Sequence, residues 1–248
     1  MDDVGQQSGA WPQCAAIFGA TGGIGSALCR ELIARGTATV FAGSRAGNGP
    51  EDSSVRPFRF DLADETTIVE AAAMMKATPP DLVIVASGVL TLADGTGPER
   101  SYKSLDPGAM AQIFAANTLG PALVAKHMLP LFARDRRCLF GALSARVGSI
   151  GDNRIGGWHS YRASKAALNM LLKNFAIELG RTHRQTIVAG LHPGTVDTAL
   201  SEPFQSNLPQ GQLTNAADAA KNLLAVIDDL TPDDSGGVFD WQGKRVPD

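Results

Sequence analysis

Residues 14–25 read CAAIFGATGGIG, an apolar segment of strand length that runs directly into a turn with four glycines. A helical pattern follows over Ile24–Arg35. Glycines at such a turn let the chain reverse sharply, let a diphosphate approach the backbone, and let the helix pack closely on the sheet. We therefore predict a strand–turn–helix unit that binds a dinucleotide. The competing interpretation is an ordinary glycine-rich turn between a strand and a helix.

The residues around this turn also indicate which dinucleotide binds. Contacts with it are expected from Gly19, Thr21, Gly22, Gly23, Ile24 and Gly25, with backbone amides at the helix start facing the phosphates. The second strand leads into Ser44-Arg45, where an NAD-binding protein carries an acidic residue for the ribose hydroxyl. Serine leaves room for a 2′-phosphate, and arginine can bind it with charge-assisted hydrogen bonds. This pattern favours NADP(H) over NAD(H), the alternative being that Arg45 is an ordinary surface arginine.

Short apolar segments alternate with longer amphipathic ones along the chain, a pattern typical of βαβ units with a parallel sheet. Further strands are expected at Ala38–Ala42, Val55–Phe60, Asp81–Ala86, Cys138–Leu143, Gln185–Leu191 and Gly237–Asp240. Further helices are expected between Asp61 and about Lys76, and over Pro107–Arg134 (with a bend or break at Gly120-Pro121), Tyr161–Arg181 and Ala216–Asp229. The predicted fold class is α/β, a Rossmann-type doubly wound parallel sheet flanked by helices, in a single domain over residues 12–248. Residues 1–11 are expected to form a flexible tail, and residues 198–213 a mobile loop.

Composition excludes several classes of function. Of the 248 residues, 44% are hydrophobic, as in a globular protein with a sizeable core, and the net charge of −3 comes without a basic stripe for nucleic acid. The chain shows no secretory signal pattern, and no apolar segment reaches the ~18 residues that span a bilayer. Cys14, Cys29 and Cys138 are expected to be buried free thiols in a reducing compartment, and no metal-ligand spacing is present. We expect a soluble cytoplasmic protein that holds no metal, binds no nucleic acid and enters no membrane.

A second motif, Tyr161-Arg162-Ala163-Ser164-Lys165, places a phenol and an ammonium four residues apart at the start of a helix. Residues at i and i+4 lie on one helical face, so both side chains can act on the same small volume. An ammonium beside a phenol stabilises the phenolate, and we expect it to lower the pKa of Tyr161. Tyr161 would then donate or accept a proton near neutral pH, beside the bound dinucleotide.

Five motifs in order along the chain resemble the short-chain dehydrogenase/reductase family, in its single-domain branch, over about Ala15 to Lys244. Within that family the chain is similar to the C-factor (C-signal) group, on residues 85–90 (VASGVL), 144–150 (SARVGSI) and 239–244 (FDWQGK). The family resemblance implies an NADP(H)-dependent carbonyl reductase, or an alcohol dehydrogenase in the reverse direction, acting on a small-molecule carbonyl or alcohol. It also implies a homodimer or homotetramer built on the two long central helices.

The resemblance implies roles for individual residues as well. Ser144 would hydrogen-bond the substrate carbonyl, Tyr161 would deliver its proton, and Lys165 would tune Tyr161 and hold the nicotinamide ribose. Asn117 would shape the long helix and help to order a proton-relay water. The other cofactor contacts that it implies are Asp61 and Leu62 near the adenine, Ala86, Ser87 and Gly88 after the fourth strand, and Pro193, Gly194, Thr195, Val196 and Thr198 after the sixth, with residues 198–213 as a substrate lid. Purely structural roles stay open for Ser144, which can cap a turn, and for Asn117, which can cap a helix.

The sequence departs from the family pattern in two places. The family's Asn-Asn-Ala-Gly is Val85-Ala86-Ser87-Gly88 here, which removes an asparagine hydrogen bond that usually ties this turn to its neighbours. Ser144 and Tyr161 are also farther apart than is usual, with the extra residues in the Asp152–His159 loop. We expect this longer loop to reshape the pocket and to leave Ser144, Tyr161 and Lys165 in their catalytic positions.

Two other functions compete with the reductase. A dinucleotide-binding regulatory or signalling protein with little turnover is consistent with the C-factor resemblance, but binding alone requires neither Ser144 nor Tyr161. A sugar-nucleotide epimerase or dehydratase usually carries a longer C-terminal substrate domain, whereas about fifty residues follow Pro193-Gly194. Residues 198–213 contain no basic cluster, which disfavours a phosphorylated or acyl-carrier substrate.

Overall fold

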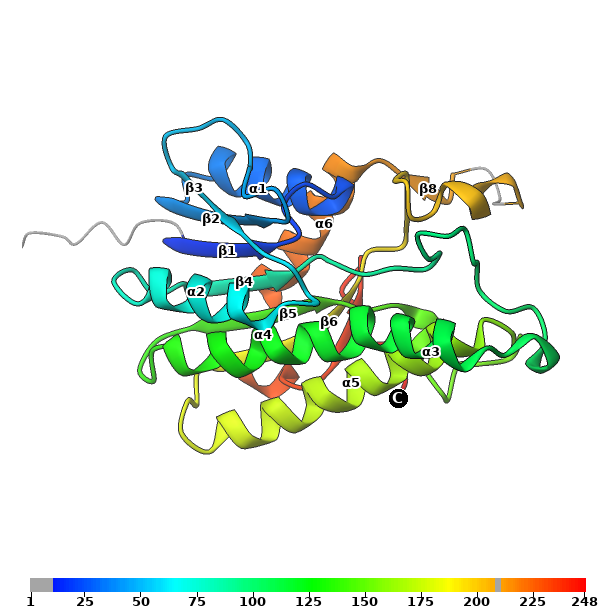
Figure 1. The fold of residues 1–248 in the computed structure, drawn as a ribbon. Coiled ribbons are helices and arrows are strands. Elements are labelled where there is room, and N and C mark those ends of the chain that lie inside the picture. The colour runs from blue at the N-terminus through cyan, green and yellow to red at the C-terminus, as the bar shows by residue number, and fades with distance from the viewer. Residues whose placement is uncertain (1–10, 208–210) are drawn as a thin grey trace, which may run out of the picture.

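The computed structural model describes residues 11–207 and 211–248, and in them seven parallel strands form the central sheet (Figure 1). The strands are β1 (Cys14–Phe18), β2 (Thr39–Ser44), β3 (Val55–Arg59), β4 (Leu82–Val85), β5 (Cys138–Leu143), β6 (Thr186–His192) and β9 (Val238–Asp240). Their order is β3-β2-β1-β4-β5-β6-β9, and every neighbouring pair is parallel. The order reverses between β1 and β4. Ligands of such sheets bind beyond the carboxyl ends of the strands at that reversal.

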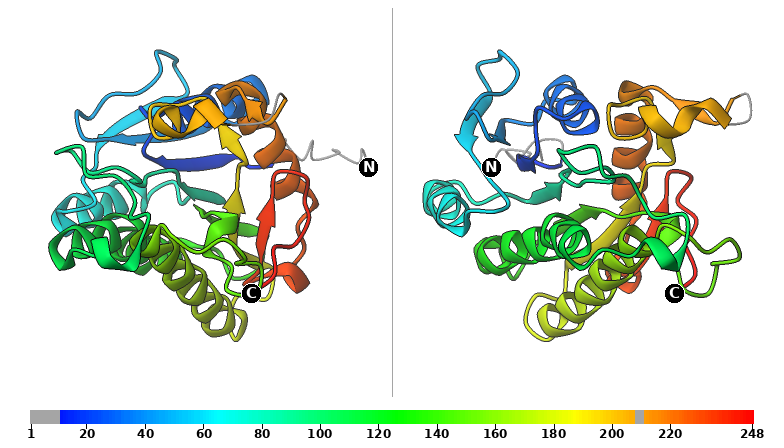
Figure 2. Two further views of the ribbon diagram at one scale, coloured as in Figure 1. Left: turned by 90° about the vertical axis from the view of Figure 1, so that its right-hand side faces the viewer. Right: turned by 45° about the vertical axis from the view of Figure 1, so that its right-hand side comes forward.

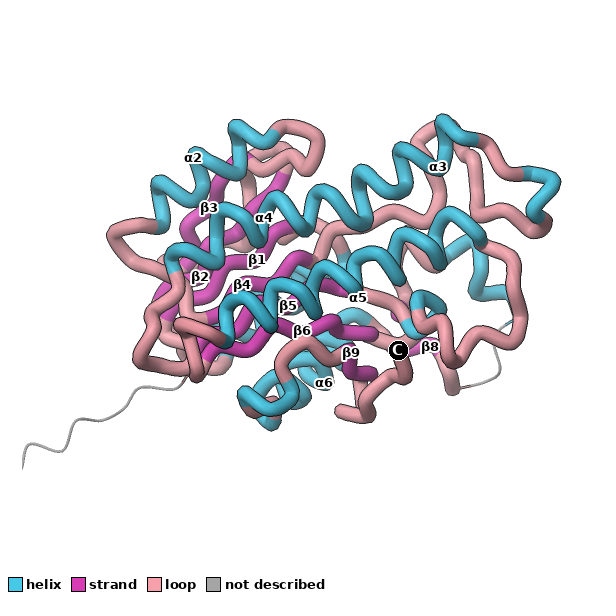
Figure 3. The backbone as a smooth tube through the Cα atoms, turned by 90° about the horizontal axis from the view of Figure 1, so that it is seen from below, coloured by secondary structure: helices cyan, strands magenta, loops and turns pink. Residues whose placement is uncertain are grey.

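Helices cover both faces of the sheet, which explains why its strands are apolar on both sides (Figure 3). Two helices, α1 (Gly23–Ala34) and α6 (Ala216–Asp229), pack together over one face. The opposite face carries α2 (Glu65–Met75), α4 (Gly120–Met128) and α5 (His159–Gly180), while α3 (Pro107–Phe114) precedes α4 and packs against α5. The predicted α/β, Rossmann-type doubly wound sheet is therefore confirmed.

The predicted long helix is present but irregular in the middle. A π-helical turn over Ala115–Leu119 joins α3 to α4 without a break. Proline lacks an amide hydrogen, and in a regular helix its ring collides with the carbonyl four residues earlier, so the wider turn just before Pro121 removes a clash. The irregularity predicted at Gly120-Pro121 therefore takes the form of a wider turn. Asn117 lies inside this turn and is fully buried.

The helical stretch Pro107–Leu131 contradicts one expectation from the sequence. It is long and apolar enough to cross a membrane by length and composition, with a mean hydropathy of 1.2, whereas no segment of that kind was expected. Its apolar side chains have another use, because Val124, Ala125 and Met128 are fully buried in the core between helix and sheet. A core helix passes the same test of length and composition, and we infer no membrane span from this stretch.

Residues 198–213 are more regular than the mobile loop expected from the sequence. The strand β7 (Thr195–Val196) pairs in parallel with β8 (Leu213–Thr214), and a 3-10 helix covers Glu202–Asn207. Both strands are shorter than the four to eight residues on which a sequence pattern can be recognised. Residues 208–210 of this segment lie outside the described residues.

The predicted N-terminal tail lies mostly outside the described residues as well, since residues 1–10 are not among them. Trp11 is described, and it packs on the body of the protein. The Arg137 guanidinium lies 4.4 Å from the centroid of its ring, and the indole Nε1 donates a hydrogen bond to the Arg137 carbonyl over 3.3 Å. Trp11 therefore belongs to the folded domain.

The three cysteines are buried and free, as predicted. Burial raises the pKa of the Cys14 and Cys29 thiols to about 12. These thiols are therefore protonated at neutral pH and act as small apolar core residues.

Phe18 lies at the carboxyl end of β1, and its replacement tests how much the aromatic core contributes to the free energy of unfolding. Its buried ring meets Phe58 and Phe60 edge to face, at centroid distances of 5.2 and 4.9 Å. We expect Phe18→Ala to lower the free energy of unfolding by about 3–5 kcal/mol, because the ring is lost and a cavity remains. Urea titration measures this change. Ile155→Ala, at a side chain 89% exposed, serves as the control and should change it by less than about 0.5 kcal/mol. An equal loss in both variants would contradict the prediction.

Candidate active site

The glycine turn after β1 is built so tightly that side chains are excluded from it. The amides of Gly19 and Ala20 both donate to the Gly43 carbonyl of β2, over 2.9 and 2.8 Å. Gly19 has a φ of +102°, which side chains rarely allow. A Cβ on Gly25 would lie 2.1 Å from the Gly19 carbonyl oxygen. The turn therefore has the close backbone packing that the sequence pattern predicts.

The turn after β4 meets this glycine turn directly. The Ala86 amide and the Ser87 hydroxyl both donate to the Phe18 carbonyl, over 2.8 and 3.2 Å. A Cβ on Gly19 would lie 2.5 Å from Ser87 Oγ. Ser87 therefore ties its turn to β1, directly after Val85 and Ala86, the two positions where the sequence lacks the family's asparagines.

The segment after β6 closes over the start of α1. Thr198 lies so near Gly23 that a Cβ there would be 2.6 Å from Thr198 Cγ2. Gly194 has a φ of +78° and faces the ring of Trp241. Val196 is held in β7 through its pairing with Thr214. The predicted contacts after the sixth strand therefore lie along one path that reaches the glycine turn.

The carboxyl end of β2 presents one cation to solvent. Ser44 is buried, and its hydroxyl donates to the Asn48 carbonyl over 2.7 Å while accepting from the Asn48 amide over 2.9 Å. Arg45 is exposed, and its side chain makes no hydrogen bond or ion pair within residues 11–207 and 211–248. Ser44 therefore shapes the loop, whereas Arg45 is available for a ligand.

The predicted adenine contacts follow β3. Asp61 Oδ1 accepts a hydrogen bond from the Ala63 amide over 3.0 Å, which folds the chain back toward α2. Leu62 packs against Gly120 so closely that a Cβ on that glycine would lie 2.2 Å from Leu62 Cδ2. This contact joins the start of α4 to the loop after β3.

Asn117 links the segment after β4 to α5. Its Oδ1 accepts from the Val89 amide and its Nδ2 donates to the Val89 carbonyl, both over 2.8 Å. The same Nδ2 donates to Ser164 Oγ over 3.2 Å. A Cβ on Gly88 would lie 3.1 Å from Asn117 Oδ1 and 3.5 Å from Lys165 Nζ. Asn117, Gly88 and Lys165 are therefore brought together, as the sequence predicts.

One face of α5 carries a stripe of polar side chains toward the end of β5. Lys165 Nζ donates to the Leu143 carbonyl over 2.8 Å. Ser144 Oγ donates to Asn169 Oδ1 over 2.6 Å. Asn169 was absent from the sequence-based site, although its position offered a signal. It follows Tyr161 by eight residues and Lys165 by four, so all three share a helical face.

Burial sets the charges of the two residues of the Tyr161–Lys165 motif. It raises the pKa of Tyr161 to about 12 and lowers the pKa of Lys165 to about 8. The expectation of a lowered Tyr161 pKa is therefore wrong for this structure, because loss of hydration outweighs any attraction between the phenolate and the Lys165 ammonium. Lys165 Nζ lies 5.9 Å from the centroid of the phenol ring and donates to a backbone carbonyl, so loss of hydration dominates for both groups. At neutral pH Tyr161 is a neutral phenol, a form that can donate a proton.

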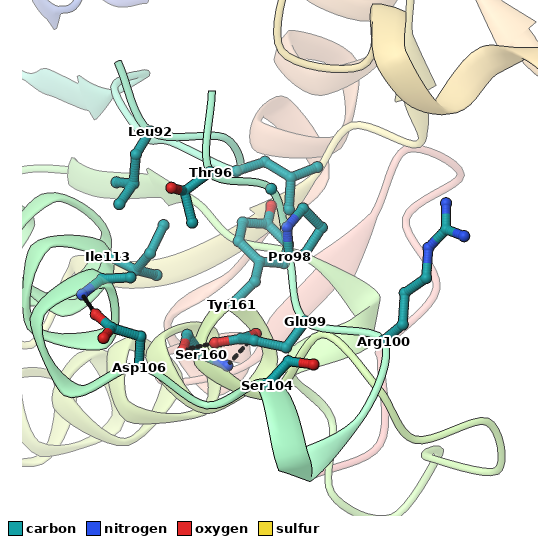
Figure 4. A pocket seen from close by; sticks show the side chains of 13 residues that line it. Leu92, Thr96, Pro98, Glu99, Arg100, Ser104, Asp106, Ile113, Ser160 and Tyr161 are labelled. Carbon is teal, nitrogen blue, oxygen red and sulfur yellow. Dashed lines mark hydrogen bonds between the residues drawn. The ribbon is translucent and has the colours of Figure 1, made fainter. Parts of the chain in front are cut away.

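A cavity of about 350 Å³ opens beside Tyr161 (Figure 4). The segments that line it lie toward the carboxyl ends of the strands, on the side turned to the viewer in the left panel of Figure 2. Its walls come mainly from the segment after β4 and from α3, with Leu90, Leu92, Pro98, Glu99, Asp106 and Ile113 among them. Sequence reasoning missed Leu92, Pro98 and Glu99 because residues 91–104 have no periodicity.

The segment predicted as a substrate lid reaches this region through one aromatic contact. The Phe204 ring lies 5.1 Å from Trp158, and Trp158 lies 6.2 Å from Tyr161 in an edge-to-face arrangement. The cavity walls include no described residue of residues 198–213. A lid role for this segment stays a prediction.

Comparison with known proteins gives the relatives of this chain. The family model described as short chain dehydrogenase matches residues 13–209. The chain is 36% identical over 169 residues to the C-signal of Myxococcus xanthus, covering 68% of this chain and 93% of that protein. It is 33% identical over 226 residues to the 1-hydroxy-2-glutathionyl-2-methyl-3-butene dehydrogenase of Rhodococcus sp. (strain AD45), covering 89% and 92%.

Among solved structures, the NADPH-bound carbonyl reductase from chicken fatty liver has the same fold. The TM-score is 0.80 at 23% identity, over 95% of this chain and 94% of that one. With the glycine turn, the Tyr161–Lys165 pair and the family model in agreement, this chain belongs to the short-chain dehydrogenase family.

Proposed function

We propose that the protein is an NADP(H)-dependent carbonyl reductase, which transfers a hydride between NADP(H) and a small carbonyl or alcohol substrate. The observation that carries the proposal is the position of Tyr161, a partly buried phenol on the wall of the cavity with Lys165 on the same helical face. Relatives named as a dehydrogenase and a carbonyl reductase support the same type of reaction.

We assign the dinucleotide to a crevice beyond the carboxyl ends of β1 and β4, where the strand order reverses. Gly19 and Gly25 let the turn after β1 pack closely, and a Cβ on Gly88 would lie 3.1 Å from Asn117 Oδ1 and 3.5 Å from Lys165 Nζ. We assign the diphosphate to Gly19, Thr21, Gly22, Gly23, Ile24 and Gly25, and the adenine to Asp61 and Leu62. The nicotinamide half is assigned to Ala86, Ser87, Gly88, Pro193, Gly194, Val196 and Thr198, with Tyr161 and Lys165 at its ribose. Bound NADPH would supply the hydride.

Four side chains are assigned to the chemistry. Tyr161 donates the proton to the substrate oxygen as negative charge develops there. Ser144 stabilises that charge with a hydrogen bond, for which its hydroxyl must rotate away from Asn169. Lys165, with its cation in the low dielectric of the interior, favours the phenolate that remains. Asn117 fixes α5 relative to the segment after β4, through Ser164 and Val89.

The C-signal relative favours a second candidate, an NAD(P)-binding signalling protein with little turnover. That function would use the glycine turn and Arg45 but would have no need of a proton donor. A single measurement separates the two candidates, because only the reductase consumes NADPH in a way that depends on Tyr161.

We propose a homodimer or homotetramer, as in the family. The apolar side chains of Met170 and Ile177 are exposed on α5, and that of Leu119 is exposed at the start of α4. An assembly through the two long helices would cover them.

Tyr161→Phe should abolish catalysis and spare cofactor binding. The change removes the proton donor and little volume, so we expect kcat to fall by about 100-fold or more. The dissociation constant of NADPH should stay within about twofold of the wild-type value. NADPH oxidation with a panel of aldehydes, ketones and quinones measures kcat. Calorimetric titration measures the dissociation constant of NADPH. Full turnover in the variant would rule out the proposed role. Tight NADPH binding without any Tyr161-dependent turnover would support the signalling protein.

Arg45→Ala should weaken NADPH far more than NADH. Arginine binds a phosphate through charged hydrogen bonds, so we expect the dissociation constant of NADPH to rise about 10- to 100-fold. That of NADH should change by less than about twofold, because it lacks the 2′-phosphate. Arg154→Ala, which removes another exposed arginine, controls for net charge. If the dissociation constants of NADPH and NADH rise equally, Arg45 does not bind the 2′-phosphate.

Reduction should lose efficiency above about pH 8. Lys165 is charged below its pKa of about 8 and neutral above it, whereas Tyr161 stays protonated up to a pKa of about 12. The value of kcat/KM for NADPH, which reports ionisations of the free enzyme, should therefore fall up to about tenfold per pH unit above pH 8. Lys165→Arg keeps its charge and should lose this limb of the profile, whatever its absolute rate. If kcat/KM falls above pH 8 in both the wild type and Lys165→Arg, the fall is caused by the ionisation of another group.

A further inference from the structure

The first turn of α5, which carries Tyr161, begins from an unusual backbone. Gly156, Gly157 and Trp158 have successive φ values of 67°, 65° and 50°. Glycine adopts this left-handed conformation readily, but a bulky residue such as Trp158 does so only when its surroundings hold it there. The side chain of Trp158, the residue that precedes the helix, makes no capping hydrogen bond. The free amides of the first turn therefore need acceptors from elsewhere in the chain.

Glu99 provides these acceptors from a segment about sixty residues earlier. Its backbone carbonyl accepts from the Trp158 amide over 2.6 Å. Its carboxylate accepts from the Ser160 amide over 3.1 Å through Oε2, and from the Ser160 hydroxyl through Oε1 (Figure 4). One residue therefore satisfies two backbone amides and one hydroxyl, immediately before Tyr161.

The electrostatics favour the same arrangement. A carboxylate at the N-terminus of a helix is stabilised by the unpaired amides and by the helix dipole. Burial raises the pKa of Glu99, but the hydrogen bonds from Ser160 outweigh it and hold the pKa below the usual range. Glu99 is therefore ionised at neutral pH, in the form that accepts hydrogen bonds at both oxygens.

Glu99 also belongs to the wall of the cavity, together with Ser160 and Tyr161. The segment that borders the substrate space is thus bonded to the residue that precedes the proton donor. On the other side, Phe204 packs on Trp158, which in turn packs on Tyr161. A displacement of Glu99 would release the first turn of α5 on its cavity side.

We propose that Glu99 is a positioning residue for Tyr161, acting as a cap that the substrate-bordering segment supplies to the catalytic helix. The proposal rests on the proposed reductase function for its effect on rate, but the cap itself can be measured without activity. Loss of the carboxylate should leave the cofactor crevice intact, because in the described structure no hydrogen bond or ion pair joins Glu99 to a residue assigned to that crevice.

Glu99→Ala, compared with Glu99→Gln, tests the effect on catalysis. We expect the alanine variant to lower kcat about tenfold or more with a changed solvent isotope effect, since proton transfer from a misplaced Tyr161 becomes slower. The dissociation constant of NADPH should stay within about twofold. Glutamine keeps an acceptor for the Ser160 amide and should restore most of kcat. A smaller active fraction would lower kcat without moving the isotope effect, and that result would reduce Glu99 to a purely structural role.

Hydrogen exchange of the peptide around residues 158–162 tests the cap directly. Exchange of these amides should rise about tenfold or more in Glu99→Ala, because Ser160 loses its acceptor. Asp94→Ala is the matched control, since Asp94 accepts a hydrogen bond from the Thr96 amide within the same segment and contacts no residue of α5 in the described structure. Unchanged exchange in Glu99→Ala, or an equal rise in Asp94→Ala, would overturn the proposal. Increased exchange in a protein whose wild type shows no Tyr161-dependent turnover would support the cap and reject the reductase.

Discussion

The contact between the Gly19 carbonyl and the Cα of Gly25 is the steric constraint on which the rest of the site depends. With only 2.1 Å available to a side chain at Gly25, the first turn of α1 can pack against the end of β1 only if that side chain is absent. The contact fixes where α1 begins, and with it the direction of the amides at its start. The Gly43 carbonyl of β2 holds the same turn from the other side, through Gly19 and Ala20. The turn to which we assign the diphosphate is therefore closely packed backbone, with amides at the start of α1.

The second half of the site is governed by desolvation. Lys165 is almost completely buried, and its ammonium donates to a backbone carbonyl at the end of β5. A buried cation with this single hydrogen bond is costly, and its pKa falls accordingly. Tyr161, partly buried beside it, stays a neutral phenol. The arrangement keeps a proton on Tyr161 and a destabilised cation within the same helical stripe, which suits proton donation to an oxygen that gains negative charge. Asn169 extends that stripe to Ser144, so the orientation of the Ser144 hydroxyl depends on α5 as well as on β5.

Much of the fold was predictable because its signals are local. Strands buried on both faces read as apolar runs, and each expected strand of the main sheet is present within a few residues. The π-helical turn, the β7–β8 pair and the early start of α5 at His159 were not predicted in that form. Each depends on a partner that lies far away in sequence or on too few residues to form a pattern. The same holds for the candidate site. The Tyr161–Lys165 spacing can be recognised from neighbouring residues, whereas the cavity wall formed by Glu99 and Ile113 depends on the fold.

The sequence by itself determined the order of strands and helices, the glycine turn and the residue types on one face of α5, because these properties follow from steric limits and helical periodicity. It also placed the chain in its family. Only the tertiary structure decided the charges, since burial reversed the expected direction of the Tyr161 pKa. Only the tertiary structure brought Glu99 to Ser160 and Asn169 to Ser144, contacts that no spacing along the chain encodes. Desolvation and long-range hydrogen bonding depend on what surrounds a group in space, and that is set when the whole sheet has formed.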